Sequence, residues 1–228
     1  MKTILIKLYS VIFNCYLLTK KSIDYKKLTT YFSIFKGTSQ NKLILNGPTL
    51  KKCKISIEGQ NNIIELQKSQ HWKTNIQIIG NNNHISISPN VQTNFTQIVL
   101  RGNNCKITIG SGTTFGGAYI VCMGENNFIK IGEECMFADS IEIWNSDTHP
   151  IYDLHGNITN PSAPVQIGNH VWCGKGSKIL KGVTIEKNAI IGMYALVTKN
   201  IAAGTLNAGI PSHTIRENIN WSRNFITK

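Results

Sequence analysis

The chain has 228 residues, of which 41% are apolar and 16% are charged. This length can bury a sizeable core in one or two domains, and this balance excludes an intrinsically disordered protein. The 24 basic and 12 acidic residues give a net charge of +12. Such a charge favours polyanionic partners, whether nucleic acid, anionic lipid, nucleotide cofactors or acidic glycans, and does not choose among them.

The first 36 residues are expected to form a short amphipathic helix followed by a connector. Lys7 interrupts the apolar stretch and no A-x-A-like cleavage site follows, so it does not match a secretory signal. It is also too short for a membrane span. Two roles stay open for the helix: packing on the domain or a partner subunit, and peripheral contact with a membrane through its lysines. Its apolar face consists of Ile4, Leu8, Val11, Ile12, Cys15 and Leu18.

The cysteines show no C-x-x-C pair and no metal-type Cys/His spacing. Several occupy positions where a small apolar residue would serve, so we expect reduced core thiols and no metal requirement. This favours a cytoplasmic protein, with the inner membrane surface as a peripheral location if the helix docks there. The six are Cys15, Cys53, Cys105, Cys122, Cys135 and Cys173.

From Gly37 onward a short phrase repeats, in which a Gly-Asn turn precedes an Ile-rich alternating segment. The glycines step by 22, 21, 22 and 22 residues. Glycine and asparagine tolerate positive φ, and the alternating segment suits a strand, so each phrase predicts one turn and one strand. The phrases are G-T-S-Q-N-K-L-I-L at 37, G-Q-N-N-I-I-E-L at 59, G-N-N-N-H-I-S-I at 80, G-N-N-C-K-I-T-I at 102 and G-E-N-N-F-I-K-I at 124.

After about residue 131 the period shortens to six. The 24-residue gap in the series equals four sixes, so residues 145–164 can leave the stack as a loop without changing its phase. A six-residue period fits neither an α-helix nor a heptad, and it is the signature of a parallel β-helix. In an ordinary β-sandwich, apolar residues would keep this six-residue spacing only by chance. The apolar anchors are Ile131, Phe137, Ile143, Ile167, Cys173, Ile179, Ile185, Ile191 and Val197.

The run V-Q-I-G-N-H-V-W-C-G-K-G-S-K-I-L-K-G-V-T-I-E-K-N-A-I-I-G-M-Y-A-L-V-T-K-N-I, with A-G-I-P-S-H-T-I-R-E after it, resembles the hexapeptide-repeat acyltransferases. Together with N-S-D-T-H-P-I-Y-D, it is most similar to bacterial polysaccharide O-acetyltransferases, particularly those acting on sialic-acid capsules. The resemblance covers residues 131–217. It implies an all-β fold, a left-handed parallel β-helix, here with a short N-terminal amphipathic helix.

We therefore expect four segments along the chain. Residues 1–36 form the helix and connector, and residues 37–130 form coils of about 22 residues. Residues 131–217 form the hexapeptide-repeat β-helix, with an active-site loop at 145–164. Residues 218–228 form a C-terminal tail.

Moving an acetyl group from a thioester to a sugar hydroxyl needs a base, because the hydroxyl is a poor nucleophile until its proton is removed. A histidine suits this role near neutral pH, and the broken stretch supplies His149. The resemblance implies the same base, acting by direct transfer without an acyl-enzyme. Asn145 and Asp147 are expected to orient the substrate or the loop, and Asp147 could instead form an Asx turn.

Trp172 precedes an anchor by one residue, so its side chain should point outward from the coil. The resemblance implies that it lines the acetyl pocket and joins His149 in the catalytic set, whereas a Trp buried between subunits would have no chemical part. Other histidines have weaker claims. His71 and His84 are expected at surface or turn positions, and His155 and His170 only flank the loop.

The resemblance also implies acetyl-CoA as co-substrate. Relatives often have Ala or Ser where Met193 stands and a basic residue at His213, so a phosphate contact at a neutral His213 would be weak. The basic residues among these contacts could instead be ordinary solvated surface charges. The implied contacts are Lys175, Met193, Thr198, Lys199, His213 and Arg216.

The expected function is O-acetylation of a bacterial surface polysaccharide, with sialic-acid capsule as the acceptor. We expect a homotrimer with the site between subunits, and no nucleic-acid partner. Acetylation of a small sugar, amino sugar, serine or antibiotic is the alternative, although the long coils favour a larger acceptor. A purely structural β-helix leaves His149 and Trp172 unexplained. A metal hydratase needs three meeting histidines, and no suitable pair accompanies His149.

Overall fold

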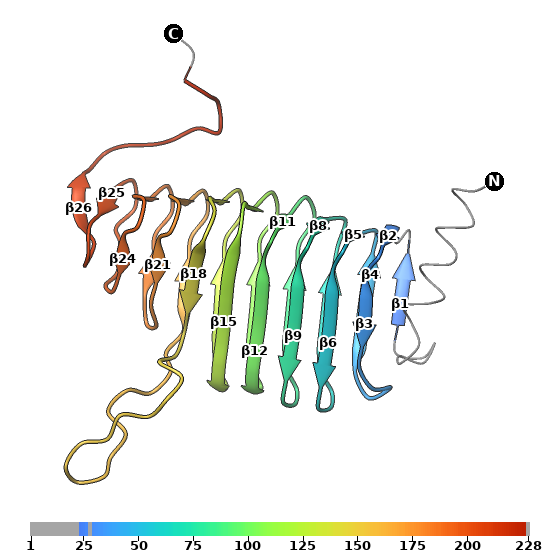
Figure 1. The fold of residues 1–228 in the computed structure, drawn as a ribbon. Coiled ribbons are helices and arrows are strands. Elements are labelled where there is room, and N and C mark those ends of the chain that lie inside the picture. Colours follow the sequence, from blue (N-terminus) through green and yellow to red (C-terminus); the bar gives the residue numbers. More distant parts are fainter. Residues whose placement is uncertain (1–22, 27–28, 227–228) are drawn as a thin grey trace.

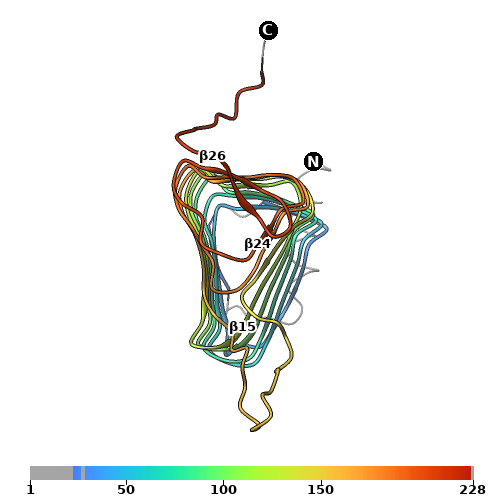
Figure 2. The same ribbon diagram turned by 90° about the vertical axis from the view of Figure 1, so that its left-hand side faces the viewer.

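The two sequence periods correspond to turns of a parallel β-solenoid. The computed structural model describes residues 23–26 and 29–226, and within these ranges it contains strands, turns and loops but no helix. Each turn adds one strand to each of three sheets, giving about eight turns and a three-sided cross-section (Figure 1, Figure 2). The expected N-terminal helix and Cys15 lie outside these residues. Across the same ranges, no helix is long and apolar enough to span a membrane.

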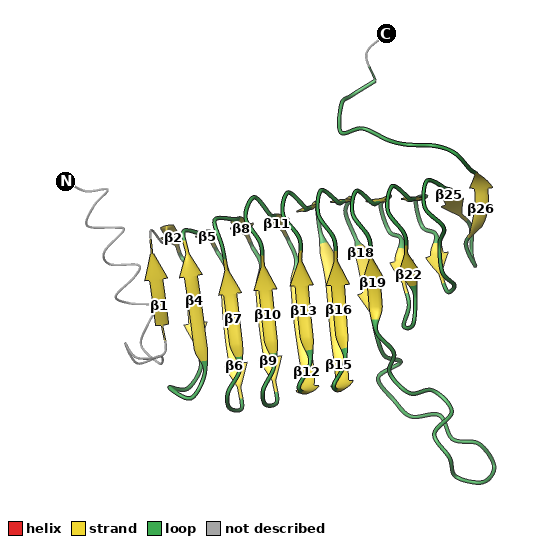
Figure 3. Cartoon of the chain, turned by 180° about the vertical axis from the view of Figure 1, so that it is seen from behind, coloured by secondary structure: helices red, strands yellow, loops and turns green. Residues whose placement is uncertain are grey.

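Three sheets run along the solenoid, and their strands pair in parallel from turn to turn (Figure 3). Sheet A comprises β1 (Ile23–Lys26), β4 (Lys42–Asn46), β7 (Ile63–Leu66), β10 (His84–Ile87), β13 (Lys106–Ile109), β16 (Phe128–Ile131), β19 (Val165–Ile167) and β22 (Thr184–Ile185). Sheet B comprises β2 (Thr29–Tyr31), β5 (Thr49–Lys51), β8 (Gln70–Trp72), β11 (Gln92–Asn94), β14 (Thr114–Phe115), β17 (Met136–Phe137), β20 (Trp172–Cys173), β23 (Ile190–Ile191), β25 (Leu206–Ala208) and β26 (His213–Arg216). Sheet C comprises β3 (Ile34–Lys36), β6 (Lys54–Glu58), β9 (Asn75–Ile79), β12 (Gln97–Asn103), β15 (Ala118–Glu125), β18 (Ile141–Trp144), β21 (Lys178–Ile179) and β24 (Leu196–Val197). Only the last pair, β25 with β26, is antiparallel among these.

Strand pairing explains both periods. In the first half, facing residues are 20 positions apart between the first two turns, as Ile23 is from Leu43, and then 21 or 22 apart, as His84 is from Ile63 and from Lys106. In the second half the spacing is 18, or three sixes, as between Trp172 and Ile190. The shorter turn leaves only two or three residues for most strands there. The predicted all-β repeat is therefore confirmed in the described residues.

The six-spaced anchors form the core of the second half, as the sequence predicts. Each points inward between the three sheets and exposes no more than 2% of its surface. Fully burying an Ile or Val side chain stabilises a fold by roughly 1.5–3 kcal/mol, so these columns are a major source of stability. The buried anchors are Ile131, Phe137, Ile143, Ile167, Cys173, Ile179, Ile185, Ile191 and Val197.

The repeated Gly-Asn phrase forms the corner between sheets C and A. The Asn62 amide donates to Asn41 Oδ1 at 2.9 Å and to the Gly80 carbonyl at 2.7 Å, and the Asn83 backbone N–H donates to Asn62 Oδ1 at 2.9 Å. This ladder satisfies polar groups inside the solenoid. A Cβ on Gly80 would lie 1.9 Å from the Gly102 carbonyl oxygen, so glycine is required there.

The start of the described chain forms the first turn of the solenoid, and the C-terminal tail contacts later turns from outside. Residues expected as a connector form β1, β2 and β3 of the first turn. In the tail, Trp221 is buried, and the Arg223 guanidinium donates to the carbonyls of Gly112 and Cys135 at 3.0 and 2.8 Å. The expectation of reduced core cysteines is confirmed for the five described thiols, which are free and buried.

Candidate active site

The break after Trp144 becomes a long loop at one corner of the solenoid. β18 ends in sheet C and β19 begins in sheet A, so residues 145–164 leave the corner between those sheets. The loop projects away from the coils (Figure 1). β16 pairs directly with β19, placing Ile131 opposite Ile167, so the stack continues beneath the loop. A rigid scaffold can carry such a loop at little cost to the fold.

Asn145 fixes the point at which this loop departs. Its side chain is fully buried, with Nδ2 donating to the Met123 carbonyl at 3.0 Å and Oδ1 accepting from the Met123 N–H at 2.6 Å. The Asn145 carbonyl accepts the Ala163 N–H at 3.0 Å, which closes the base of the loop. The amide is thus occupied inside the fold, in keeping with an orienting role.

A tight turn presents His149. Its backbone N–H donates to the Asp147 carbonyl at 2.8 Å, and Thr148 between them has a φ of 74°. This is a γ-turn in its less favourable form, and a β-branched residue at positive φ costs on the order of 1–3 kcal/mol. Surrounding contacts must therefore hold the turn. The His149 side chain itself is exposed.

Asp147 supplies that restraint. Its Oδ2 accepts from Lys181 Nζ at 2.5 Å and from Asn160 Nδ2 at 2.8 Å, and the same Nδ2 donates to the His149 carbonyl at 3.0 Å. The Lys181 hydrogen bond, followed by that of Asn160, lowers the pKa of Asp147 below its usual range, so the carboxylate stays ionised. Asp147 and Asn160 thus hold the turn that carries His149.

The tip of the loop is a separate unit. Asp153 Oδ1 accepts the backbone N–H groups of His155 and Asn157 at 2.8 and 2.9 Å, and Tyr152 bridges to Ile158 in antiparallel fashion. These contacts do not involve the turn at His149.

Trp172 lies on the outer side of β20, with Cys173 pointing into the core, as the six-residue spacing predicts. The C-terminal tail packs beside it. The Trp221 ring lies 5.9 Å from that of Trp172 and stacks on His170 at 4.2 Å with planes 6° apart. Trp221 Nε1 donates to the His170 carbonyl at 2.8 Å.

His149 and Trp172 lie on different sides of one chain. The loop leaves the corner between sheets C and A, whereas Trp172 lies on sheet B, which faces away from that corner. Figure 2 shows the loop projecting from one end of the cross-section and the tail lying beyond the opposite side. A single chain therefore does not bring the two expected catalytic residues together.

Two of the expected donor contacts share the corner between sheets B and C. Lys175 and Met193 lie on consecutive turns, and the Lys175 carbonyl accepts the Tyr194 N–H at 2.8 Å. Lys175 Nζ lies 3.5 Å from Asp139, and Met193 is 64% exposed. These two expected donor contacts are therefore both exposed at one corner of a single chain.

The other expected donor contacts divide between two places. His213 and Arg216 lie exposed on β26 at the end of sheet B, and the Ser212 N–H before this strand donates to the Leu196 carbonyl at 2.8 Å. Thr198 and Lys199 are exposed after β24, at the corner between sheets C and A. Those two residues therefore do not join Lys175 on one surface of a single chain.

The expectation that His71 is a surface or turn residue is wrong. His71 is 3% exposed in the middle of β8, where Nε2 lies 2.8 Å from Ser69 Oγ and Nδ1 lies 2.7 Å from Thr93 Oγ1. Burial lowers its pKa to about 4. His84 is partly exposed beside Glu65, at 3.9 Å. Nowhere in the described ranges do three His, Cys, Asp or Glu side chains gather as a metal site would require.

Sequence reasoning missed three residues that shape these sites. Asn160 and Lys181 meet Asp147 only after the loop folds back over the next turn, so no local motif marks them. Trp221 reaches His170 across 51 positions. For the contact between Trp221 and His170, the only indication in the sequence was a single tryptophan within a polar tail.

Comparison with known proteins agrees with this architecture. The family described as bacterial transferase hexapeptide (six repeats) matches residues 164–199. The galactoside O-acetyltransferase of Escherichia coli K12 is 43% identical over 70 residues, covering 30% of this chain and 34% of that protein. The chain thus matches only about a third of that curated relative's length.

Two solved structures match almost throughout. The polysialic acid O-acetyltransferase OatWY is 30% identical, with a TM-score of 0.68 over 92% of this chain and 91% of that chain. The polySia-specific acetyltransferase NeuO is 25% identical, with a TM-score of 0.72 over 91% of this chain and 88% of that chain. On the strength of that identity and coverage, the chain belongs to the hexapeptide-repeat acetyltransferase family.

Proposed function

We propose that this protein transfers acetyl from acetyl-CoA to a hydroxyl of a bacterial surface polysaccharide, with sialic-acid capsule as the acceptor. The main support for this proposal is the extent of the match to OatWY and NeuO. The match includes the 21- and 22-residue turns as well as the hexapeptide region. Both proteins are described as acting on polysialic acid. The long turns also add surface on which a polymer can lie.

In this proposal the scaffold is a left-handed β-helix and His149 is the general base. The exposed imidazole takes the proton of a sugar hydroxyl as its oxygen attacks the thioester carbonyl. The acetyl group passes directly to the sugar, and the CoA thiol leaves with the proton. Asp147, held ionised by Lys181, orients the turn. Trp172 forms a wall of the acetyl pocket.

The proposed assembly is a homotrimer with active sites between subunits. The placement of His149 at the corner between sheets C and A and of Trp172 on sheet B supports a site shared between copies. One copy would supply the base and its neighbour the pocket wall. The same arrangement would let Lys199 of one copy and Lys175 of another face one donor molecule.

The test is release of CoA thiol from acetyl-CoA in the presence of candidate acceptors. We expect activity with a sialic acid polymer and a loss of roughly 100- to 10,000-fold in His149→Ala, the usual contribution of a general base. His155→Ala, which alters the tip of the same loop, serves as the matched control and should keep activity. Full activity in His149→Ala would refute the proposed mechanism.

A small sugar is the second candidate acceptor, favoured by the 43% identity to a galactoside O-acetyltransferase. The same assay separates the two, because each acceptor is supplied alone. Thiol release with a galactoside but not with the polymer would replace the polysaccharide proposal.

A further inference from the structure

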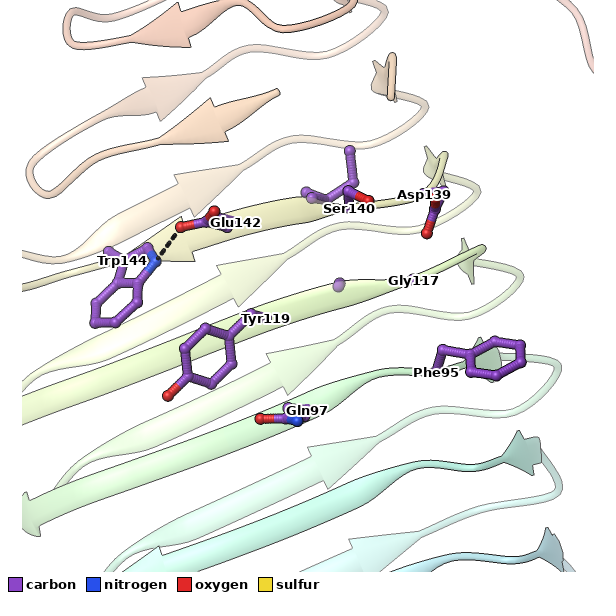
Figure 4. Close-up of a pocket in the computed structure, with 10 residues that line it drawn as sticks. Phe95, Gln97, Gly117, Tyr119, Asp139, Ser140, Glu142 and Trp144 are labelled. Carbon is purple, nitrogen blue, oxygen red and sulfur yellow. Dashed lines mark hydrogen bonds between the residues drawn. The ribbon is translucent and has the colours of Figure 1, made fainter. Parts of the chain in front are cut away.

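A groove of about 500 Å³ crosses the outer face of sheet C, next to the loop. Its floor is formed by outward-facing side chains of β12, β15 and β18, and Figure 4 shows how these side chains lie along the neighbouring strands. The lining includes Phe95, Gln97, Tyr119, Asp139, Glu142 and Trp144. None of these residues belongs to the expected catalytic or donor-binding set.

The groove is hollow because one turn lacks side chains at its corner. Gly116 and Gly117 occupy the corner between sheets B and C, between Phe95 on one turn and Asp139 on the next. A Cβ added to Gly117 would lie 2.6 Å from Asp139 Oδ1 and would begin to fill the space. The two consecutive glycines in the sequence therefore account for the groove at this corner.

Aromatic faces and fixed polar groups alternate inside it. The rings of Tyr119 and Trp144 lie 5.2 Å apart at 90°. Trp144 Nε1 donates to Glu142 Oε2 at 3.1 Å, and Lys178 Nζ pairs with Glu142 Oε1. Pockets that bind small polar molecules combine apolar walls with a few oriented polar groups. This combination suits a sugar, which has apolar ring faces and a rim of hydroxyl groups.

The rim next to Phe95 adds a cation to this surface. Phe95 is 50% exposed at a φ of 45°, packs against Trp72 at 4.7 Å, and has Lys73 Nζ 4.6 Å above its ring. A bulky residue at positive φ is unfavourable. Lys52 and Lys73 hold the same positive-φ position at this corner in the two preceding turns, so an aromatic residue at position 95 is not imposed by the fold.

We propose that this groove binds a sugar unit of the acceptor glycan. The inference rests on the proposed function and specifies where that acceptor is held. The sugar ring packs against Tyr119 and Phe95, and its hydroxyls meet the polar side chains of Gln97 and Glu142. Trp144 is the last residue of β18 before the loop, so a chain held here lies beside the segment that carries His149.

The test measures binding of an unacetylated sialic acid polymer by calorimetry without acetyl-CoA. Phe95→Asn removes the ring but keeps a residue that tolerates positive φ, and Tyr119→Ala removes the second ring. Each should weaken binding about tenfold, as expected for truncation of an aromatic hot spot. Phe32→Asn is the matched control, since Phe32 has a φ of 49° at the same corner, outside the groove, and should bind normally.

Steady-state kinetics and sedimentation complete the test. Both groove variants should raise KM for the polymer while preserving kcat and the oligomeric state. Unchanged binding and KM would overturn the groove assignment even if the enzyme acetylates the polymer. A changed oligomeric state would also overturn it, by showing that the groove is an interface between copies. Polymer binding that depends on Phe95, with no acetylation, would uphold the groove and refute the proposed reaction.

Discussion

At the scale of single residues, His71 is the histidine whose charge the fold tolerates least. It titrates near pH 6.5 in an unfolded chain, and its pKa falls to about 4 when it is buried. Between these values the unfolded state binds more protons, so the free energy of unfolding should fall as the solution is acidified from pH 6.5 to 4. A lowering of about 2.5 pKa units corresponds to a loss of roughly 3 kcal/mol.

Denaturant unfolding of wild type and His71→Gln across this pH range tests that expectation. The variant should be less stable at pH 7, because a buried hydrogen-bonded ring is lost, but its stability should change less with pH. His84 and other groups remain in both proteins, so the difference isolates His71. Equal pH dependence in the two proteins would contradict the assignment.

His71 also shows what the sequence could and could not reveal. It faces Leu50 and Thr93 in the neighbouring turns, so its inward direction follows from the 21- to 22-residue register. Histidine is usually read as a surface residue, and the polar pair Ser69 and Thr93 that satisfies it was recognisable only once that register was known. The burial of the anchors from Ile167 to Val197 could be predicted without the register, because their six-residue period is visible in the local sequence.

At the scale of elements, the base and tip of the loop should respond differently to mutation. Asn160 joins Asp147 to the His149 carbonyl, whereas Asn157 bonds only to Asp153 at the tip. We expect Asn160→Ala to lower kcat by roughly 10- to 100-fold, because a displacement of about 1 Å can cost that much. KM for acetyl-CoA and the free energy of unfolding should stay nearly unchanged, since this part of the loop is largely exposed.

Asn157→Ala is the matched control, the same substitution in the same loop. Its kcat should stay within about twofold of wild type, because the tip does not hold the turn at Thr148. Similar losses in the two variants would show that the whole loop, and not the Asp147 contact, positions the base. The Asn160 contact joins residues 13 positions apart in an irregular loop, so periodicity could not foretell it.

At the scale of the whole molecule, one chain places His149 and Trp172, the two expected catalytic residues, on different sides of the solenoid. The fold itself was predictable, because every turn repeats the same local pattern of turn residue, strand and inward apolar side chain. The separation of His149 from Trp172 was not, because it depends on which corner a loop leaves and which sheet a strand joins. The repeat determines how the turns stack, whereas the position of His149 depends on the loop at 145–164, where the repeat is interrupted.

Mass spectrometry of a sialic acid polymer incubated with the protein and acetyl-CoA tests the proposed reaction directly. We expect acetyl groups on the polymer with wild type, few or none with His149→Ala, and none on a neutral glycan treated in parallel. Acetylation that is equal with the His149→Ala variant, or that occurs only on small free sugars, would contradict it.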